Sequence, residues 1–349
     1  MLAAVATGSG LLVDEVAEPV PGPGQVLVAP LATGICGSDL HLASMLAEFG
    51  DAAPAMVLGH EFCARILEPG PATSGRFAPG TRVVSIPHAD GTAGTENLGL
   101  STALPGGFAE RMVLQERYLL VVPDHLGDDH AALTEPLAVA VHAVHTGRLA
   151  RGDAALVVGC GPIGLAVIAV LKAAGHGPII ATDFSPARRR LAEQLGADVV
   201  LDPATDSPYE RWADLGITEQ PPSPLRTGPL GGIGDVVAFE CVGVPGLIQQ
   251  IVDGVPRHSR IVVIGVCLQP DTVTPVSAIL KEVTISFVFA YRAHEFAEAL
   301  ELITSERVDA SAFVTGHVGL DQVAGAFAEL ADPGRHVKIM VEPVLAHPG

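Results

Sequence analysis

The sequence of 349 residues is poor in cationic and aromatic side chains. Lysine and arginine number 20 against 39 aspartates and glutamates, which gives a formal net charge of −19. Nucleic-acid binding requires cationic patches that release counterions from the phosphates. Aromatic residues make up only 4% of the chain, too few for a base-stacking surface. These shortages exclude a nucleic-acid partner.

The cysteines are too few and too scattered for a disulfide framework. They are odd in number, and no two of them form a Cys-x-x-Cys pair. They stand at Cys36, Cys63, Cys160, Cys241 and Cys267. Such a set favours a reducing compartment, so we expect a cytoplasmic protein.

The chain also lacks a long apolar run and a basic leader. The longest uncharged apolar stretch, residues 156–171, is shorter than the ~18 residues that a membrane span needs. Glycines and a proline interrupt its first half. The N-terminus has no basic region, and Asp14 and Glu15 soon follow. We therefore expect neither a signal peptide nor a membrane partner.

A large apolar fraction is what the sequence does contain. Hydrophobic residues make up 48% of the chain and charged residues only 17%, which suits a packed core and excludes disorder. At roughly 150 residues per domain, the length predicts two domains.

The pattern of expected secondary structure changes near residue 145. Up to residue 143, short strands follow glycine and proline turns, as at 25–29, 82–86 and 118–122. From about residue 145, apolar strands alternate with helices, which predicts an α/β domain whose parallel sheet is covered on both faces. Its strands are expected at 156–158, 178–182, 198–201, 235–240 and 260–264, and its helices at 163–174 and 186–195.

A proline-rich segment, residues 203–234, interrupts this alternation. It predicts a long crossover loop, interpreted as a flexible surface insertion, with at most one short helix around 209–215. After residue 281 strands and helices mix, and the last strand is expected at 336–341.

A Gly-x-Gly-x-x-Gly motif stands where the strand at 156–158 is expected to turn into a helix. Gly159 permits the tight turn, Gly161 lets a pyrophosphate approach the backbone, and Gly164 lets the helix pack closely. The helix N-terminus attracts the phosphate charge. The same motif also occurs in purely structural turns, so its context decides. The expected contacts to the cofactor are Gly159, Gly161, Pro162, Ile163 and Gly164.

Asp183 supplies that context, since it ends the next expected strand about 20 residues after the motif. A carboxylate there accepts hydrogen bonds from the adenosine ribose and repels a 2′-phosphate, so NAD is favoured over NADP. The run Arg188, Arg189, Arg190 leaves NADP as the alternative. We expect these arginines to form a solvated helix face, with Arg188 near the adenine.

The β-rich part contains a possible metal-binding set. Cys36, His60 and Glu61 offer a soft thiolate, an imidazole and a carboxylate within a short stretch of chain, which suits Zn²⁺ with an open coordination position. Glu135, just before Pro136, is a further acid. Taken singly, Cys36 is more often a small buried apolar residue, and His60 with Glu61 is more often a hydrogen-bonded pair at a turn.

The combined motifs resemble those of the zinc-dependent medium-chain alcohol dehydrogenases. They are Gly-Ile-Cys-Gly-Ser-Asp-Leu-His at 34–41, Leu-Gly-His-Glu-Phe at 58–62, Glu-Pro-Leu-Ala-Val-Ala-Val-His at 135–142 and Val-Val-Gly-Cys-Gly-Pro-Ile-Gly-Leu at 157–165. The resemblance covers nearly the whole chain. Within the family it is closest to the sorbitol, threonine and butanediol dehydrogenases, which carry glutamate at the position of Glu135.

The resemblance implies a GroES-like catalytic domain, residues 1–145 and 287–349, and a Rossmann domain, residues 146–286, with zinc and cofactor in the cleft between them. Cys36 and His60 match the constant zinc ligands. Glu61 and Glu135 match acids that ligate directly, through water or alternately, and the choice stays open. Further cofactor contacts are implied at Cys241, Val242, Ile264, Gly265 and, on the pyrophosphate, Lys338.

The chain departs from the family in the lobe that holds a second, structural zinc. The stretch between Pro87 and Gly107 contains no cysteine. We therefore expect one catalytic zinc per chain and no structural zinc, with the lobe held by turns and packing.

The resemblance also implies a mechanism. Zinc stabilises the alkoxide of the substrate, Ser38 accepts its proton and passes it toward His41, and the carbinol hydride moves to the nicotinamide. Apolar candidates for the substrate wall are Met45, Leu46, Phe49, Phe108 and Phe287, although a core stripe explains the first three almost equally well. His142 and His145, on the helix after Glu135, are expected to be packed or capping.

Three functions compete at this point. The first is a zinc- and NAD-dependent dehydrogenase of a secondary alcohol or polyol, working in either direction. The second is a zinc-free NAD(P)H-dependent reductase of an activated alkene or quinone on the same fold. The third is a catalytically silent NAD(H)-binding protein. The combined cysteine, histidine and glutamate set favours the first. A homodimer or homotetramer, paired at a sheet edge formed by 260–266 and 283–289, is expected from the resemblance.

Overall fold

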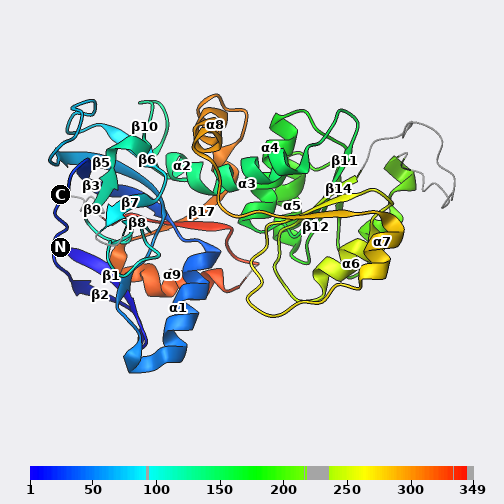
Figure 1. Cartoon of the computed structure of the whole chain (residues 1–349), viewed down its shortest axis with the longest axis horizontal. Helices are drawn as coiled ribbons and strands as arrows, with labels where there is room; N and C mark the ends of the chain where they lie inside the picture. Colours follow the sequence, from blue (N-terminus) through cyan, green and yellow to red (C-terminus); the bar gives the residue numbers. More distant parts are fainter. Residues whose placement is uncertain (92–93, 216, 218–235, 333, 344–349) are drawn as a thin grey trace. The chain divides into compact units, whose positions relative to one another are not determined.

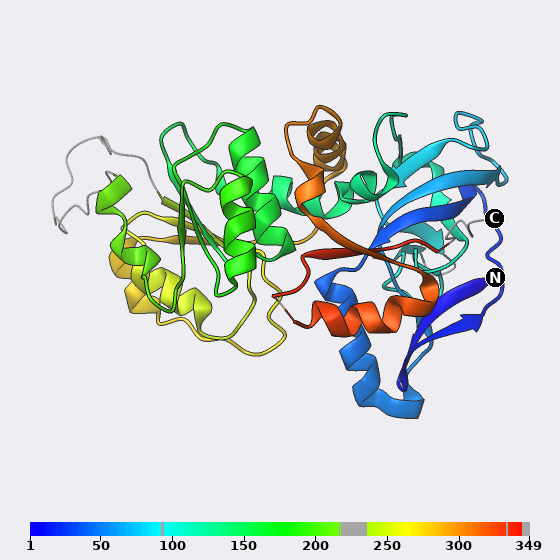
Figure 2. The same ribbon diagram turned by 180° about the vertical axis from the view of Figure 1, so that it is seen from behind.

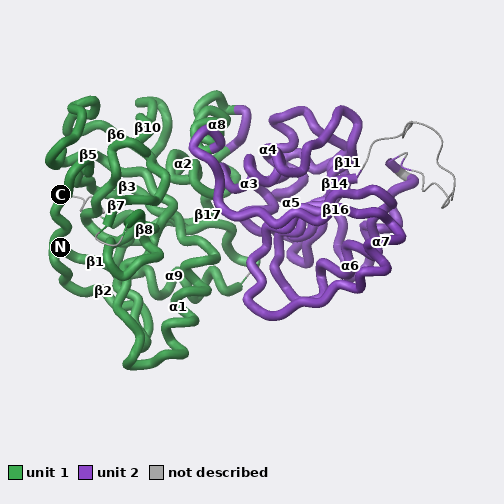
Figure 3. Tube along the Cα trace, in the orientation of Figure 1, with its two compact units in different colours: residues 1–136, 296–306, 310–349 green, residues 137–295, 307–309 purple. Residues whose placement is uncertain are grey.

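The computed structural model describes residues 1–91, 94–215, 217, 236–332 and 334–343. The chain forms two compact units: unit 1 comprises residues 1–136, 296–306 and 310–349, and unit 2 comprises 137–295 and 307–309 (Figure 3). Unit 1 is therefore made of three separate stretches of the chain. Its boundaries at 136 and 296 fall within the helices α3 (Thr134–Gly147) and α8 (Ala293–Thr304), each of which contributes residues to both units.

The main sheet of unit 1 has the strand order β10-β6-β5-β3-β18-β17, with β9 also paired to β3. Its central strand, β3, runs antiparallel to both β5 and β18. The strands are β3 (Gln25–Gly34), β5 (Glu61–Pro69), β6 (Arg82–Ser85), β9 (Met112–Gln115), β10 (Leu119–Val121), β17 (Val314–Val318) and β18 (Lys338–Val341).

Smaller elements of unit 1 surround this sheet (Figure 1). A three-stranded sheet contains β1 (Leu2–Thr7), β2 (Gly10–Glu15) and β4 (Met56–Val57), and a hairpin contains β7 (His88–Gly91) and β8 (Gly94–Asn97). The helices are α1 (Gly37–Phe49), α2 (Asp128–Ala132) and α9 (Val323–Leu330), with 3-10 turns at Gly50–Ala52, Glu116–Tyr118, Ala310–Ala312 and Leu320–Gln322.

The β7–β8 hairpin lies in the cysteine-free stretch between Pro87 and Gly107. Ala89, on β7, and Leu98, just after β8, are fully buried and pack into the core beneath the main sheet. Arg117 also makes a bidentate ion pair with Asp90 of the hairpin, with both distances 2.7 Å. Packing and polar contacts therefore hold this lobe in place.

Unit 2 contains the expected parallel sheet. Its six strands follow the order β13-β12-β11-β14-β15-β16, and every neighbouring pair is parallel. This is the doubly wound order of a dinucleotide-binding fold. The strands are β11 (Ala154–Val158), β12 (Ile179–Thr182), β13 (Val199–Leu201), β14 (Val236–Glu240), β15 (Arg260–Val263) and β16 (Thr284–Phe287).

Right-handed crossovers from the centre of this sheet set the position of its helices. They put α4 (Pro162–Ala173) and α5 (Pro186–Gln194) on one face and α6 (Leu247–Gly254) and α7 (Pro275–Lys281) on the other (Figure 2). The central strands β11, β12, β14 and β15 are therefore buried on both sides, which explains their continuous apolar runs. No helix in the described ranges is long and apolar enough to cross a membrane.

The start of the proline-rich segment is better anchored than a flexible surface insertion. It contains two 3-10 turns, Pro208–Glu210 and Ala213–Leu215. Between them Trp212 is only 6% exposed, packs on the sheet core and donates its Nε1–H to the carbonyl of Gly254 at 3.0 Å. The expectation of a free surface loop is wrong for this part, and the rest of the segment, 216 and 218–235, lies outside the described residues.

Candidate functional site

Three neighbouring strand ends bring the metal-binding candidates of unit 1 together. Because β3 is antiparallel to β5 and β18, its last residue lies beside the first residue of β5, and the next residue, Ile35, donates its backbone N–H to Ile339 of β18. Gly34, at the end of β3, pairs with Glu61 of β5 and with Met340 of β18. Cys36 follows β3 directly, so the topology carries it toward His60 and Glu61.

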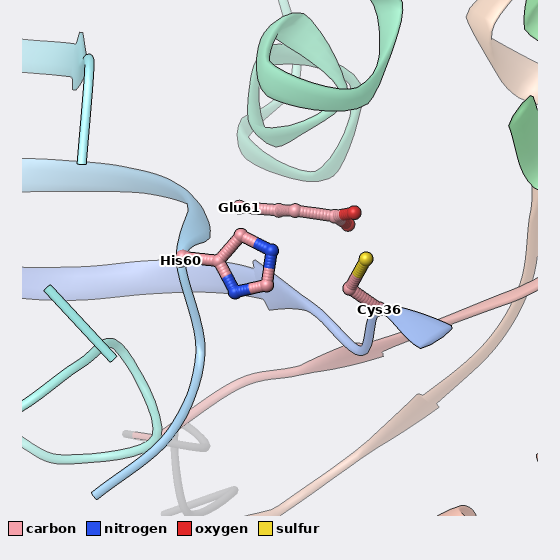
Figure 4. A group of neighbouring side chains, drawn as sticks. All are labelled: Cys36, His60 and Glu61. Atoms are coloured by element: carbon pink, nitrogen blue, oxygen red, sulfur yellow. The ribbon is translucent and has the colours of Figure 1, made fainter. Parts of the chain in front are cut away.

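Cys36, His60 and Glu61 form one group, the Cys36 cluster. One ligand atom from each side chain lies within 4.8 Å of the others, and Figure 4 shows the three side chains pointing toward one another. His60 and Glu61 are buried, and Cys36 is half-buried. A thiolate, an imidazole and a carboxylate at this spacing make a three-ligand set that leaves a coordination position open for a substrate.

Glu61 is held by a buried ion pair with Lys338. The Lys338 Nζ lies 2.6 Å from Glu61 Oε2 and 3.1 Å from the carbonyl of Ile35, and both side chains are almost fully buried. Burial alone would lower the pKa of Lys338, but the Glu61 carboxylate and the Cys36 thiol raise it above its ordinary value. Gly34 makes room for this pair, since a Cβ there would overlap Glu61 Oε2.

The surroundings of Lys338 correct one expectation. Lys338 is 1% exposed and its ammonium is bonded to Glu61 and Ile35, so in this structure it does not reach out to a pyrophosphate. The other carboxylate oxygen, Glu61 Oε1, is buried without a hydrogen-bond partner. A buried, unsatisfied carboxylate oxygen is costly, and a cation bound in the Cys36 cluster would satisfy it. These residues therefore fit a zinc ion.

Asp39 is a contributor that the sequence motifs did not single out. Its fully buried carboxylate accepts the backbone N–H of Cys36 at 2.9 Å and that of Gly59 at 3.3 Å. Its Oδ1 also lies 3.4 Å from His60 Nδ1. Asp39 thus ties the Cys36 turn to the segment that carries His60. The only signal in the sequence is its place in the first turn of α1, where an acidic residue caps a helix.

The same carboxylate affects His60. Burial alone would lower the pKa of His60, but Asp39 and the Cys36 thiol raise it well above its ordinary value. The other ring nitrogen, Nε2, lies 3.3 Å from Ser38 Oγ. Ser38 is only partly buried, and His41, three residues further along α1, is exposed. Residues three apart share a helix face, so Ser38 and His41 lie in line from the cluster toward solvent.

Glu135 is not a member of the Cys36 cluster. It lies in the first turn of α3 and is half-buried. Of the two acids left open by the sequence, Glu61 is the one that the structure brings within reach of Cys36 and His60.

The candidates for the substrate wall divide into core and exposed residues. Leu46 and Phe108 are 4% and 0% exposed and belong to one core cluster of unit 1, so their assignment to a substrate wall is wrong. Met45 and Phe49, also on α1, are 43% and 64% exposed. Phe287 is an exposed residue of β16 in unit 2.

The glycine motif of unit 2 lies where the sequence predicts it. It follows β11, and Gly161 is the N-cap of α4. A Cβ at Gly164 would overlap the carbonyl oxygen of Gly159, which explains that glycine by helix packing. A Cβ at Gly161 would meet only Arg188 Nη1, at 3.9 Å. No protein atom therefore requires Gly161, and the open space above it at a helix N-terminus fits a phosphate.

Asp183 lies beside this turn, immediately after β12. Its carboxylate accepts the backbone N–H of Cys160 at 2.8 Å and that of Ser185 at 2.7 Å. Arg188 approaches it at 4.0 Å, whereas Arg189 is paired with Asp202 at 2.9 Å. Of these two arginines, Arg188 is thus the one beside the glycine turn.

The remaining cofactor candidates follow the adjacent strands of the same sheet. Cys241 and Val242 come directly after β14, and Ile264 and Gly265 directly after β15. The buried carboxylate of Glu240 accepts the N–H groups of Val242 and Gly243, each at 2.8 Å. Glu240 therefore shapes this loop at the carboxyl edge of the sheet, where dinucleotides bind in doubly wound folds.

Family models match both parts of the chain. Residues 22–124 match the alcohol dehydrogenase GroES-like domain, and residues 162–305 match the zinc-binding dehydrogenase family. The chain is 34% identical to (R,R)-butanediol dehydrogenase of Bacillus subtilis, over 95% of this chain and 96% of that protein. It is 31% identical to human sorbitol dehydrogenase, over 98% and 95% of the two chains.

A solved structure agrees with this similarity. The crystal structure of 2R,3R-butanediol dehydrogenase from Bacillus subtilis superimposes with a TM-score of 0.82 and 32% identity. The match covers 98% of this chain and 99% of that one. Both units of the chain therefore take part in the likeness.

Proposed function

The chain belongs to the zinc-dependent medium-chain alcohol dehydrogenase family, and we propose that it transfers a hydride between a secondary alcohol or polyol and NAD(H). The observation that carries this proposal is the Cys36 cluster, a thiol, imidazole and carboxylate whose histidine and glutamate are buried, with one carboxylate oxygen left unsatisfied. A zinc-free reductase has no need for such a set, and the alternative is not favoured.

Cys36, His60 and Glu61 are the proposed ligands of one catalytic zinc. When bound there, zinc supplies a Lewis acid that stabilises negative charge on the substrate oxygen. Asp39 orients the cluster through its bonds to the backbone of both ligand-bearing segments. Lys338 neutralises the Glu61 carboxylate and holds one of its oxygens. Glu135 stays a candidate for an alternate or water-mediated ligand.

Ser38 and His41 are the proposed proton path. Ser38 Oγ, next to His60 Nε2, accepts the hydroxyl proton of the alcohol. His41 lies exposed on the same face of α1 and takes the proton on toward solvent. An imidazole suits this place because it titrates near neutral pH.

NAD is the proposed cofactor. Its pyrophosphate would be bound by the turn at Gly159, Gly161 and Gly164, and its ribose hydroxyls by the Asp183 carboxylate. That carboxylate is partly exposed at the end of β12, where it disfavours a 2′-phosphate. Arg188 is assigned to the adenine. Cys241, Val242, Ile264 and Gly265 complete the proposed binding edge.

A homodimer formed along β16 is the proposed assembly. Among the described strands β16 pairs only with β15, so its outer edge is open. Apolar side chains are exposed on and beside it, with Phe287 at 74% and Phe289 at 91%. An open edge with exposed apolar residues is typical of a protein–protein interface.

A cytoplasmic location is also proposed. All five cysteines are free thiols in the structure, and Cys63 and Cys160 are buried. Thiols of this kind persist in a reducing compartment.

NADH formation with a panel of alcohols tests the proposed reaction. We expect turnover of secondary alcohols and polyols, including (R,R)-2,3-butanediol and sorbitol, to exceed that of ethanol. The Ser38→Ala variant should lower kcat while leaving NADH binding unchanged. Failure to oxidise any member of the panel in the zinc-loaded protein would contradict the proposal.

A further inference from the structure

A second group of metal-binding side chains lies in unit 2 and shares no residue with the Cys36 cluster. His145, His294 and Glu295 form this group, the His145 cluster. One ligand atom from each of them lies within 4.8 Å of the others. His145 comes from α3, whereas His294 and Glu295 are consecutive residues in the first turn of α8. The cluster therefore joins two helices that are far apart in the sequence.

The carboxylate at the centre of the cluster is buried. Glu295 is 3% exposed, and its Oε2 accepts the backbone N–H of Arg292 at 2.7 Å. His145 Nδ1 lies 3.2 Å from Glu295 Oε1. His142, one helical turn earlier on the same face of α3, places its Nδ1 3.0 Å from Glu295 Oε2. The imidazoles of His142 and His145 thus converge on one buried carboxylate. A ring nitrogen of His294 lies within 4.8 Å of the ligand atoms of His145 and Glu295.

His142 and His145 both contact the Glu295 carboxylate, which goes beyond the packing or capping role expected for them. A histidine that only packs does not need a carboxylate, and one carboxylate is enough to partner one imidazole. Neutral imidazole nitrogens together with a carboxylate oxygen suit late first-row divalent metals. The exposed faces of His145 and His294 give such an ion access from solvent.

We propose that His145, His294 and Glu295 bind a second divalent transition-metal ion, of the zinc, cobalt or nickel class, that connects α3 to α8. His142 is a positioning residue, since its bond to Glu295 orients the carboxylate. The site differs chemically from the Cys36 cluster because it contains no thiolate. Its role is structural: an ion bound only by the folded state stabilises that state by mass action.

Cobalt titration of the metal-free, full-length protein tests the proposal. Thiolate-bound Co²⁺ shows a sulfur-to-metal charge-transfer band in the near ultraviolet, whereas Co²⁺ bound by imidazole and carboxylate shows only the weaker visible bands. We expect about two equivalents of Co²⁺ to bind, of which one gives no charge-transfer band. Zinc should raise the Tm further after the Cys36 cluster is filled.

Variants separate the two sites. In the His145→Ala/His294→Ala double variant, and in Glu295→Gln, the equivalent without a charge-transfer band should be lost and the charge-transfer band should remain, which also reports an intact fold. His317→Ala is the matched control: its side chain is 44% exposed, like that of His145, and lies near Asp129 and Glu342. It should retain both equivalents. Two results would overturn the proposal. One is wild-type protein that binds only the Co²⁺ ion with the charge-transfer band. The other is a second Co²⁺ ion that still binds in the His145→Ala/His294→Ala and Glu295→Gln variants.

Discussion

Asp39 acts on the metal site through its ligands rather than by ligation. Its carboxylate accepts the N–H groups of Cys36 and Gly59, and it lies 3.4 Å from His60 Nδ1. Partners of this kind orient the ligands and typically change metal affinity by about 10- to 100-fold. We expect Asp39→Asn to weaken zinc binding by that factor in a competition titration with a chelator.

The control for this prediction is Asp51→Asn, an exposed acid in the 3-10 turn after α1. It should leave zinc affinity unchanged, and both variants should retain the wild-type KM for NAD. A zinc affinity of Asp39→Asn equal to that of wild type would remove Asp39 from its positioning role.

The proposed function assigns the preference between the two cofactors to Asp183. Replacing it with alanine removes the acceptor of the ribose hydroxyls and the charge that repels a 2′-phosphate. Hydrogen bonds to a charged group contribute about 1.5–3 kcal/mol, so the ratio of kcat/KM for NAD over NADP should fall about 10- to 100-fold. Steady-state kinetics with both cofactors measures this ratio. Asp202→Ala, which removes the partner of Arg189, is the control and should leave the ratio in place.

The ligand residues could be predicted from the sequence, whereas their supports could not. Cys36, His60 and Glu61 stand in short, recognisable motifs. Lys338 lies 277 positions from Glu61 along the chain, so no local pattern reports that their side chains meet. The resemblance implies a pyrophosphate contact for Lys338, and only the tertiary fold places its ammonium beside Glu61. Asp39 stands in the first turn of α1, but its contact with the backbone of Gly59 depends on the tertiary fold, so no local pattern reports it.

At the scale of elements, the turn between β11 and α4 contains two glycines with different roles: Gly164 is needed for packing, and Gly161 is proposed for cofactor binding. Gly164→Ala would place a methyl group against the carbonyl oxygen of Gly159. Overpacking of this kind costs about 1–3 kcal/mol, so the Tm should fall. Gly161→Ala meets no protein atom closer than 3.9 Å. It should keep the wild-type Tm and lose NADH affinity, as measured by the quenching of bound-NADH fluorescence. Unchanged NADH affinity in Gly161→Ala would count against a pyrophosphate at this turn.

Elements could be predicted where burial on both faces leaves a continuous apolar run. The strands of unit 2 follow this pattern, and those observed lie within a residue or two of the expected ranges. The helix α1 was less visible, because its exposed face carries the apolar residues Met45 and Phe49. The anchoring of Trp212 was missed as well, since the surrounding prolines indicate a loop but do not report what the indole packs against.

At the scale of the whole molecule, the open edge of β16 predicts an oligomer. Phe289→Asp introduces a charge at the most exposed apolar side chain beside this edge. It should shift the protein toward the monomer in size-exclusion chromatography with light scattering. Phe49→Asp, on the exposed face of α1, is the matched control and should keep the wild-type mass. A wild-type protein that is monomeric at micromolar concentration would contradict a dimer along β16.

The division into two units was predictable in kind but not in detail. The change from glycine-broken strands to alternating strands and helices marks two domains in the sequence. The boundaries at 136 and 296 fall inside α3 and α8, and no composition change occurs within a helix to reveal them. The charge of −19 is not a clue to the substrate, since only a few carboxylates have assigned roles.

The central claim is that a zinc ion bound by the Cys36 cluster makes this chain an alcohol dehydrogenase. Its most direct test is the rate of NADH formation from NAD and (R,R)-2,3-butanediol or sorbitol, measured on metal-stripped protein as zinc is returned. We predict that stripping abolishes the rate and that zinc restores it in wild type but not in Cys36→Ala, which should still bind NADH. An undiminished rate in the stripped protein, or full activity in Cys36→Ala, would contradict the account.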